Sequence, residues 1–415
     1  MTVNRRKQQI QTWTLLFVTA AVVVVGFLYN PSGQFSDIRP FYGMRYWNGE
    51  HPWPFSEYLP IGSTSPVPPI EYPALTGLII WILTFLIPES LNSTMHYFYL
   101  SSFLHGLLFI VLALMVKRIT NLRLAYLLVL SPAVITSLNR NWDIWVMIPT
   151  LASILFFERK KYFLSALLLG IAIATKFFPV VLLLPILIFF VRAKEMNNLF
   201  IYLGTTVTTW LTINVPVLAV DLSGWSFFYK LSFTRGLGEG SVFTIPAKLG
   251  FSIEFDSIVY YSLNIFIFAS LIVLLWKFPK NVPLVESAFL VVTAFTFFGK
   301  QYSMQYVLWL APLAIIAIGK VNKKDRKRLF GGYILWQIFE MLFHQAYYQN
   351  LLARVLESRG TPLAEYWSDF EYGVSASVRY LTFLIFLGIY INALIKDGKR
   401  SLKVRGLGVR TVTRN

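Results

Sequence analysis

The sequence predicts an all-α integral membrane protein, a polytopic helical bundle of about 12 transmembrane helices. The 415-residue chain is 56% hydrophobic and only 14% charged, whereas soluble domains carry roughly 25% charged residues. Apolar runs of about 16 to 23 residues recur along it, the length that crosses a bilayer as a helix. Short basic loops separate many of these runs, as the positive-inside rule requires of one side. We therefore expect one membrane-embedded domain over residues 1–415.

The predicted spans fill most of the chain between a basic head and a basic tail. The first apolar run follows "MTVNRRKQQIQ" and has no convincing small-residue cleavage site, so we interpret it as a retained helix rather than a signal peptide. The spans are expected at 10–29, 94–116, 122–138, 142–157, 162–178, 180–191, 199–219, 256–276, 284–299, 302–319, 329–350 and 374–395.

Positive charge gathers in loops that fall on one side if these spans alternate. The net charge is +17, and the segments 320–328 and 396–415 are among the most basic stretches. Loops rich in Lys and Arg stay in the cytoplasm and attract anionic lipid headgroups. Both termini are therefore expected in the cytoplasm, and membrane lipids rather than nucleic acid are the expected partners. The chain has no cysteine, which excludes disulfides and thiolate metal sites.

The segment "YPALTGLIIWILTFLIP" at 72–88 is apolar but breaks this alternation. A crossing there would turn every later basic loop outward, so we expect a helix that lies in, or dips into, the outer leaflet. It belongs to a long first extracytoplasmic loop at 30–93, which carries juxtamembrane helices.

That first loop contains the strongest candidate for chemistry, "FSDIRPFYGMRYW". Asp37 follows the first span almost directly, and a partly desolvated carboxylate can act as a general base. Arg39 and Arg45 either oppose the rise in basicity that desolvation gives this carboxylate or bind an anionic phosphate, and Glu71 is a candidate for hydrogen bonds to sugar hydroxyls or to an arginine of the same loop. The alternative is an interfacial anchor, because Trp and Tyr favour the headgroup zone.

Two further polar stretches lie at predicted outer ends of spans. "SLNRNWDIW" places Asn141 and Asp143 either in a plain helix–helix turn, with Asp143 as a cap, or in a polar wall facing the first loop. Lys176 precedes a Phe-Phe-Pro break, where it either snorkels to the headgroups or contacts a lipid-linked phosphate. The sequence leaves both choices open.

Two outer loops complete the candidate set. "SFTRGLGEGS" contains Arg235 and Ser241 among glycines that allow close approach to an anion, or that simply make a flexible connector. "GKQYSMQYVLW" places Lys300, Tyr302 and Gln305 at an outward hairpin, where interfacial anchoring is the alternative to ligand binding. The four histidines show no metal-binding spacing, so neither a metal site nor a cofactor is expected.

Taken together, these motifs resemble those of glycosyltransferase family 87 and its relatives in the C superfamily of membrane glycosyltransferases. The resemblance rests on "SDIRPFYGMRYW", "EYPALTGL", "NRNWDIWVMIP", "GIAIATKFFPVVLLLPIL", "RGLGEGS" and "GKQYSMQYVLWLAPL", in that order between residues 35 and 312. These enzymes depend on polyprenyl-phosphate sugars and include actinobacterial α-mannosyltransferases. The resemblance implies a catalytic aspartate in the first outer loop, which matches Asp37, and it adds Tyr72 of "EYPALTGL" to the candidate substrate contacts. One departure is that Leu237 and Glu239 occupy a zone that is often aromatic and aspartate-rich in relatives.

The resemblance predicts a multi-pass enzyme of the cell membrane with its active site on the extracytoplasmic side. It would transfer a sugar, expected to be mannose, from a polyprenyl-phosphate donor to a lipid-linked or glycan acceptor, with inversion. Asp37 would be the general base, and Lys176, Arg235, Lys300 and Arg39 would stabilise the departing phosphate. Two alternatives remain: a transporter or flippase of a lipid or sugar, and an inactive glycosyltransferase-like scaffold.

Overall fold

The computed structural model describes residues 2–46, 49–60, 62–238, 240–253, 255–277, 284–357 and 367–410. Within these residues the protein is all-α, as predicted, and the strand-like pairing is a single bridge between Tyr58 and Val67. The first half comprises α1 (Thr2–Tyr29), α2 (Ile38–Arg45), α3 (Ala74–Thr84), α4 (Ser93–Ile119), α5 (Leu122–Val129), α6 (Pro132–Ser137), α7 (Met147–Glu158), α8 (Tyr162–Thr175), the 3₁₀ helix η1 (Phe178–Leu182) and α9 (Leu183–Ala193). The second half comprises α10 (Met196–Val220), α11 (Leu222–Thr234), η2 (Val242–Thr244), α12 (Ile245–Lys248), α13 (Ser257–Lys277), α14 (Leu284–Phe297), η3 (Met304–Tyr306), α15 (Val307–Lys320), α16 (Lys323–Glu357) and α17 (Asp369–Arg410).

Each predicted span coincides with helical structure, although not always with one long helix. Five helices are long and apolar enough to cross a membrane by themselves, namely α1, α4, α10, α13 and α17. The span predicted at 122–138 is divided into α5 and α6 at Pro132, because a proline cannot donate the backbone hydrogen bond that would continue a helix. η1 continues into α9 and η3 into α15, and even these combined helices, Phe178–Ala193 and Met304–Lys320, belong to the shorter apolar helices.

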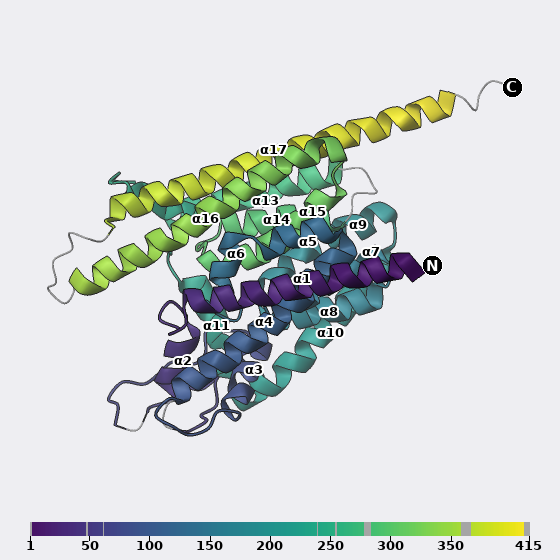
Figure 1. Ribbon diagram of the computed structural model, residues 1–415. Helices are drawn as coiled ribbons and strands as arrows, with labels where there is room; N and C mark the ends of the chain where they lie inside the picture. The colour runs from purple at the N-terminus through teal and green to yellow at the C-terminus, as the bar shows by residue number, and fades with distance from the viewer. Residues whose placement is uncertain are drawn as a thin grey trace.

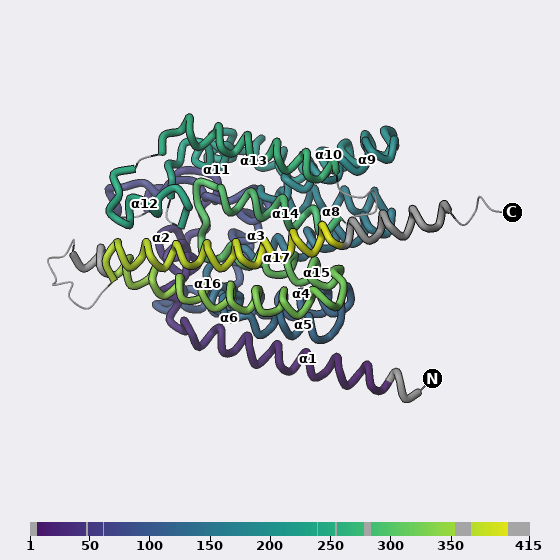
Figure 2. Tube along the Cα trace, turned by 90° about the horizontal axis from the view of Figure 1, so that it is seen from above, coloured from purple at the N-terminus to yellow at the C-terminus, as the bar shows by residue number. Residues whose placement is uncertain are grey.

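The helices form an elongated bundle whose long axis follows α1, α16 and α17 (Figure 1). α16 and α17 run side by side in both views, while α1 and α13 lie on opposite flanks (Figure 2). α15 is the central helix, since its residues from Val307 to Ile318 are buried. The start of α1 and the end of α17 lie at the same end of the bundle, and the first loop lies at the other (Figure 1).

The first loop is packed onto the bundle through α3. Thr76 donates a hydrogen bond to the carbonyl of Thr175 at the end of α8 (2.5 Å), so α3 begins where α8 ends. A side chain at Gly77 would clash with the ring of Phe55, which shows how closely the loop covers this helix. α3 has 11 residues, or about 16 Å of helix, roughly half of a hydrocarbon core. Its placement in the outer leaflet stays a prediction.

The loop predicted at 220–255 contains a further helix, α11. Asp221 caps it, since its side chain accepts a hydrogen bond from the backbone N–H of Gly224 (2.8 Å). The same carboxylate accepts a hydrogen bond from Ser56 (2.7 Å), which ties α11 to the first loop. These two loops therefore lie against each other at the end of the bundle where α1 ends.

Candidate active site

Asp37 lies at the start of α2 and faces the turn between α6 and α7. Its backbone N–H donates to the carbonyl of Arg140 (2.8 Å), and its carboxylate Oδ1 lies 3.4 Å from Nη2 of Arg140. The side chain makes no capping hydrogen bond to α2 and is 45% exposed, whereas that of Arg140 is 14% exposed. The carboxylate is therefore oriented by a guanidinium group on one side and is open on the other.

Arg140 is itself fixed by groups that lie far away in the sequence. It donates to the carbonyl of Phe35 (2.8 Å) and to the hydroxyl of Tyr348 on α16 (3.2 Å). Its guanidinium also lies over the rings of Tyr347 and Tyr348, at 5.8 and 5.3 Å from their centroids. Arg140 was not among the predicted site residues, although it lies in the motif "NRNWDIW" with Asn141 and Asp143.

A second ion pair lies beside the first. Lys176 Nζ is 2.6 Å from Oδ1 of Asp143, whose side chain is fully buried. The ammonium group also lies over the rings of Tyr72 and Trp309, at 4.7 and 5.8 Å. Asn141 supports this turn by accepting a hydrogen bond from the backbone N–H of Asp143 (3.0 Å).

A third ion pair joins the first loop to the glycine-rich loop. Arg235 Nη2 lies 2.5 Å from Oε2 of Glu71, and its Nη1 donates to the side-chain oxygen of Gln301 (3.1 Å). The Arg235 and Glu71 side chains are 36% and 52% exposed. This pair is the most open of the three, so a ligand can compete for both partners.

Tyr72 lies close to the acidic residue of each of the three pairs. Burial raises the pKa of its hydroxyl group, and the carboxylates of Asp37, Asp143 and Glu71 raise it further. Three acids therefore lie within electrostatic range of one partly buried phenol, whose ring packs edge-on against Trp142 (5.3 Å between centroids). The cluster combines a half-exposed carboxylate, which can accept a proton, with cations that can hold a phosphate.

The family model of Glycosyltransferase family 87 matches residues 71–300, more than half of the 415-residue chain. The chain belongs to glycosyltransferase family 87. Glu71, Asp143, Lys176 and Arg235 fall inside the matched region, while Asp37 precedes it. No match was found among curated proteins.

Two solved structures resemble this family 87 protein over 92% of its length. They are ArnT from Cupriavidus metallidurans bound to undecaprenyl phosphate (14% identity, TM-score 0.44) and the same protein in the apo state (15% identity, TM-score 0.45). In each case the match covers 76% of the ArnT chain.

The remaining predicted residues of the first loop make structural contacts in this family 87 chain. Arg39 donates to the carbonyl of Ser32 (2.8 Å). Arg45 is buried and donates to the carbonyls of Pro68 and Trp53 (2.8 Å each) and to that of Ser56. A guanidinium group enclosed by three carbonyls organises the loop, and it leaves Arg45 little capacity for a ligand.

The predicted residues after Arg235 also lie against protein rather than in the cluster. Ser241 donates to the carbonyl of Gly299 (2.9 Å), and Lys300 donates to the carbonyl of Phe233 (2.7 Å). Tyr302 and Gln305 are buried. These contacts join the glycine-rich loop to the hairpin before α15. Glu239, which departs from the family pattern, lies outside the described residues.

A buried charged network, which the sequence analysis did not identify, holds these loops in place. Arg379 on α17 lies 2.5 Å from Glu340 on α16, and both side chains are completely buried. Arg379 also donates to the carbonyl of Tyr302 (2.9 Å), while Tyr372 and Tyr380 bind the backbone of Gly240 (2.8 and 2.9 Å). The sequence did contain a signal for this network, because Glu340 and Arg379 are charged residues inside the predicted spans 329–350 and 374–395.

In the described part of the chain, His, Asp and Glu side chains do not gather in groups of three that would hold a metal ion.

Proposed function

We propose that this family 87 glycosyltransferase transfers a sugar, with mannose as the expected one, from a polyprenyl-phosphate donor to a lipid-linked or glycan acceptor. The reaction would take place on the extracytoplasmic side of the cell membrane. The observation that carries this proposal is the half-exposed Asp37 carboxylate beside Arg140, in one cluster with the pairs Asp143–Lys176 and Glu71–Arg235. This cluster lies at the end of the bundle opposite the basic segments at the start of α1 and α16.

The proposed chemistry is a single displacement. The acceptor hydroxyl oxygen attacks the anomeric carbon, the bond from that carbon to the phosphate oxygen breaks, and the hydroxyl proton passes to Asp37. The products are the inverted glycoside and the free lipid phosphate. Arg140 holds the carboxylate in place, and the open face of Asp37 leaves room for the hydroxyl. General-base catalysis of this kind typically contributes about 10²–10⁴-fold in rate.

Cations near the leaving phosphate would stabilise the charge that develops there. Arg235 suits this role because its partner Glu71 is half-exposed and can be displaced or shared. Lys176 is a second candidate, with Asp143 orienting its ammonium group. Arg39 and Lys300 are weaker candidates, since each is engaged by a backbone carbonyl outside the cluster.

The test is to incubate the purified full-length protein with a panel of polyprenyl-phosphate sugars and a glycan or lipid acceptor. We expect the protein to release lipid phosphate from one of the donors. The variant Asp37→Asn should no longer release it. Counterflow of a lipid or sugar in proteoliposomes without chemical conversion would instead identify a transporter. If the folded protein releases lipid phosphate from none of the donors in the panel, the proposed activity is contradicted and a scaffold is favoured.

A further inference from the structure

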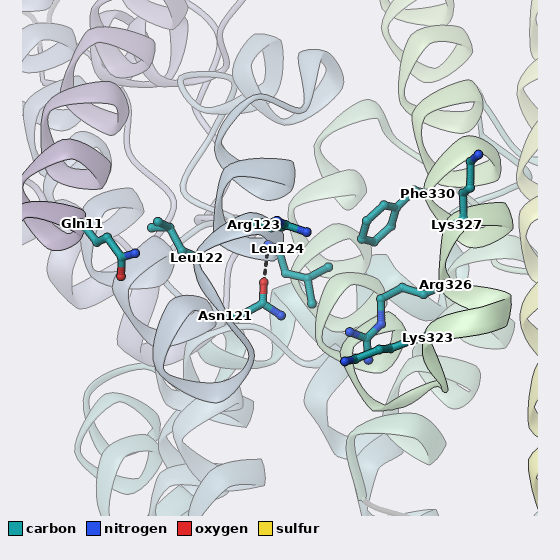
Figure 3. A pocket seen from close by; sticks show the side chains of 9 residues that line it. All are labelled: Gln11, Asn121, Leu122, Arg123, Leu124, Lys323, Arg326, Lys327 and Phe330. Carbon is teal, nitrogen blue, oxygen red and sulfur yellow. Dashed lines mark hydrogen bonds between the residues drawn. The ribbon is translucent and has the colours of Figure 1, made fainter. Parts of the chain in front are cut away.

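A basic groove opens at the end of the bundle opposite the candidate active site. Gln11 on α1 is one of its lining residues, and Tyr29, where α1 ends, lies about 27 Å further along at 1.5 Å per residue. That distance is close to the thickness of a hydrocarbon core. The groove has a volume of about 750 Å³ and lies between α1, the start of α5 and the start of α16 (Figure 3). Its lining residues are Gln11, Asn121, Leu122, Arg123, Leu124, Lys323, Arg326, Lys327 and Phe330.

Four of the lining residues are cationic and none is acidic. Arg326 is partly engaged, since it donates to the carbonyls of Gly319 and Val321 (2.9 and 2.8 Å). Within the described residues no hydrogen bond or ion pair engages the side chains of Arg123, Lys323 or Lys327. The groove therefore concentrates positive charge that the described part of the chain does not pair with acidic groups.

The nearest acid in the sequence does not neutralise this charge. Asp325 is buried and does not line the groove. Its carboxylate accepts a hydrogen bond from the side chain of Asn322 (3.1 Å), and its backbone N–H donates to the same side chain (3.3 Å). Asn322 thus caps the start of α16, and the Asp325 carboxylate is engaged by this cap rather than by the cations of the groove.

Three of the other lining residues are apolar, a combination with the cations that suits an amphiphile. Leu122 and Leu124 come from α5, and Phe330 faces them from α16 (Figure 3). The groove lies beside the first turns of α1, which belong to an apolar span that begins at Arg6. The groove therefore offers both cations and apolar side chains, the two kinds of group that a phospholipid meets at the membrane surface.

We propose that the basic groove binds the phosphate of an anionic phospholipid in the leaflet at which α1 begins. This site is separate from the donor site, and it does not depend on which sugar is transferred. A free phosphate compound offers the same anionic chemistry without the acyl chains, so the experiment compares the two sources directly. The bound lipid would link α1, α5 and α16 at the end of the bundle that is predicted to face the cytoplasm.

The test uses full-length protein in detergent and measures binding of short-chain phosphatidylglycerol, short-chain phosphatidylcholine and inorganic phosphate. The variant Lys323→Gln/Lys327→Gln removes two groove cations, and Arg159→Gln/Lys161→Gln removes two exposed cations outside the groove. We expect the groove variant to weaken phosphatidylglycerol binding by about tenfold to thirtyfold, because each cation at an anionic lipid surface contributes roughly fivefold. The control variant should retain the affinity of the unmodified protein.

Three results would overturn the proposal. Equal binding of phosphatidylglycerol and phosphatidylcholine would show that the groove does not select an anionic lipid. Equal losses in both variants would show that only the general surface charge matters. Tighter binding of inorganic phosphate than of phosphatidylglycerol, lost in the groove variant, would identify a soluble ligand. Unfolding temperatures measured without ligand show whether a variant still folds. The single variant Arg123→Gln removes a groove cation from α5, so it tests the loss of binding without changing α16.

Discussion

Two carboxylate–guanidinium pairs in this protein have the same chemistry and opposite surroundings. Asp37 and Arg140 lie 3.4 Å apart at the end of the bundle, with side chains that are 45% and 14% exposed. Glu340 on α16 and Arg379 on α17 lie 2.5 Å apart, and both side chains are 0% exposed. The first carboxylate has an open face, whereas the second also accepts hydrogen bonds from Trp336 (3.0 Å) and Tyr302 (3.4 Å).

Exposure therefore separates a carboxylate that can take part in a reaction from one that holds helices together. A buried charge that loses its partner is costly, since desolvation is no longer offset, whereas an exposed one returns to water at little cost. Substitution should accordingly affect the rate at Asp37 and folding at Glu340. The predictions below test this separation from the largest expected effect to the smallest.

The largest effect is expected at the open carboxylate. Asp37→Asn should lower the rate of sugar transfer by about 10²–10⁴-fold, because an amide cannot accept the acceptor's proton. The unfolding temperature should stay close to that of the unmodified protein, since the side chain is half-exposed. Released lipid phosphate and thermal unfolding in detergent are the two measurements.

Glu57→Gln is the matched control, because Glu57 is an exposed acid of the same loop. Both its rate and its unfolding temperature should be unchanged. If Asp37→Asn transfers sugar as fast as this control, Asp37 is not the base.

At the buried carboxylate of Glu340, the main effect of a substitution should be on stability. Glu340→Gln leaves Arg379 charged and buried, so we expect a loss of about 3–5 kcal/mol in unfolding free energy. The activity should fall with it, because Arg379 holds the carbonyl of Tyr302 (2.9 Å). Adding Arg379→Met should recover part of the stability by removing the unpaired charge. Unchanged unfolding of the single variant would mean that the pair contributes no structural constraint.

The sequence was sufficient to predict the helices but not the pairs. Apolar runs of membrane-spanning length fix where helices form, and each predicted span contains at least one helix, although the spans 122–138, 142–157 and 162–178 also include non-helical residues. Asp37, Asp143 and Lys176 were recognised because each lies at or just beyond the end of a predicted span, and Arg235 because it lies in a glycine-rich outer loop.

Their partners were not predictable, because pairing depends on how distant segments pack. Arg140 is 103 residues from Asp37 along the chain, and no local pattern connects them. Arg45 shows the converse: an arginine among aromatic residues suits ligand binding and loop packing equally, and its three carbonyl contacts favour packing.

Lys176 and Asp143 form an intermediate case, with 18% and 0% exposure. Lys176→Met should destabilise the protein by about 1–3 kcal/mol, because it leaves the buried Asp143 acceptor without its donor. It should also slow the transfer, whereas Lys176→Arg should keep much of both properties. Equal unfolding temperatures for the Met and Arg variants would show that the ion pair does not hold this turn.

The smallest effect on stability is expected at the most open pair. Arg235→Gln breaks the contact with Glu71, and exposed ion pairs contribute less than about 1 kcal/mol to unfolding free energy. If Arg235 meets the donor phosphate, the KM for the donor should rise several-fold while the unfolding temperature stays constant. The difference from the unmodified protein should shrink at high salt, since ions screen an exposed guanidinium group. Lys230→Gln, which removes an exposed cation of α11, should leave the KM unchanged, and an equal rise in both variants would assign the effect to general charge rather than to the Arg235 side chain.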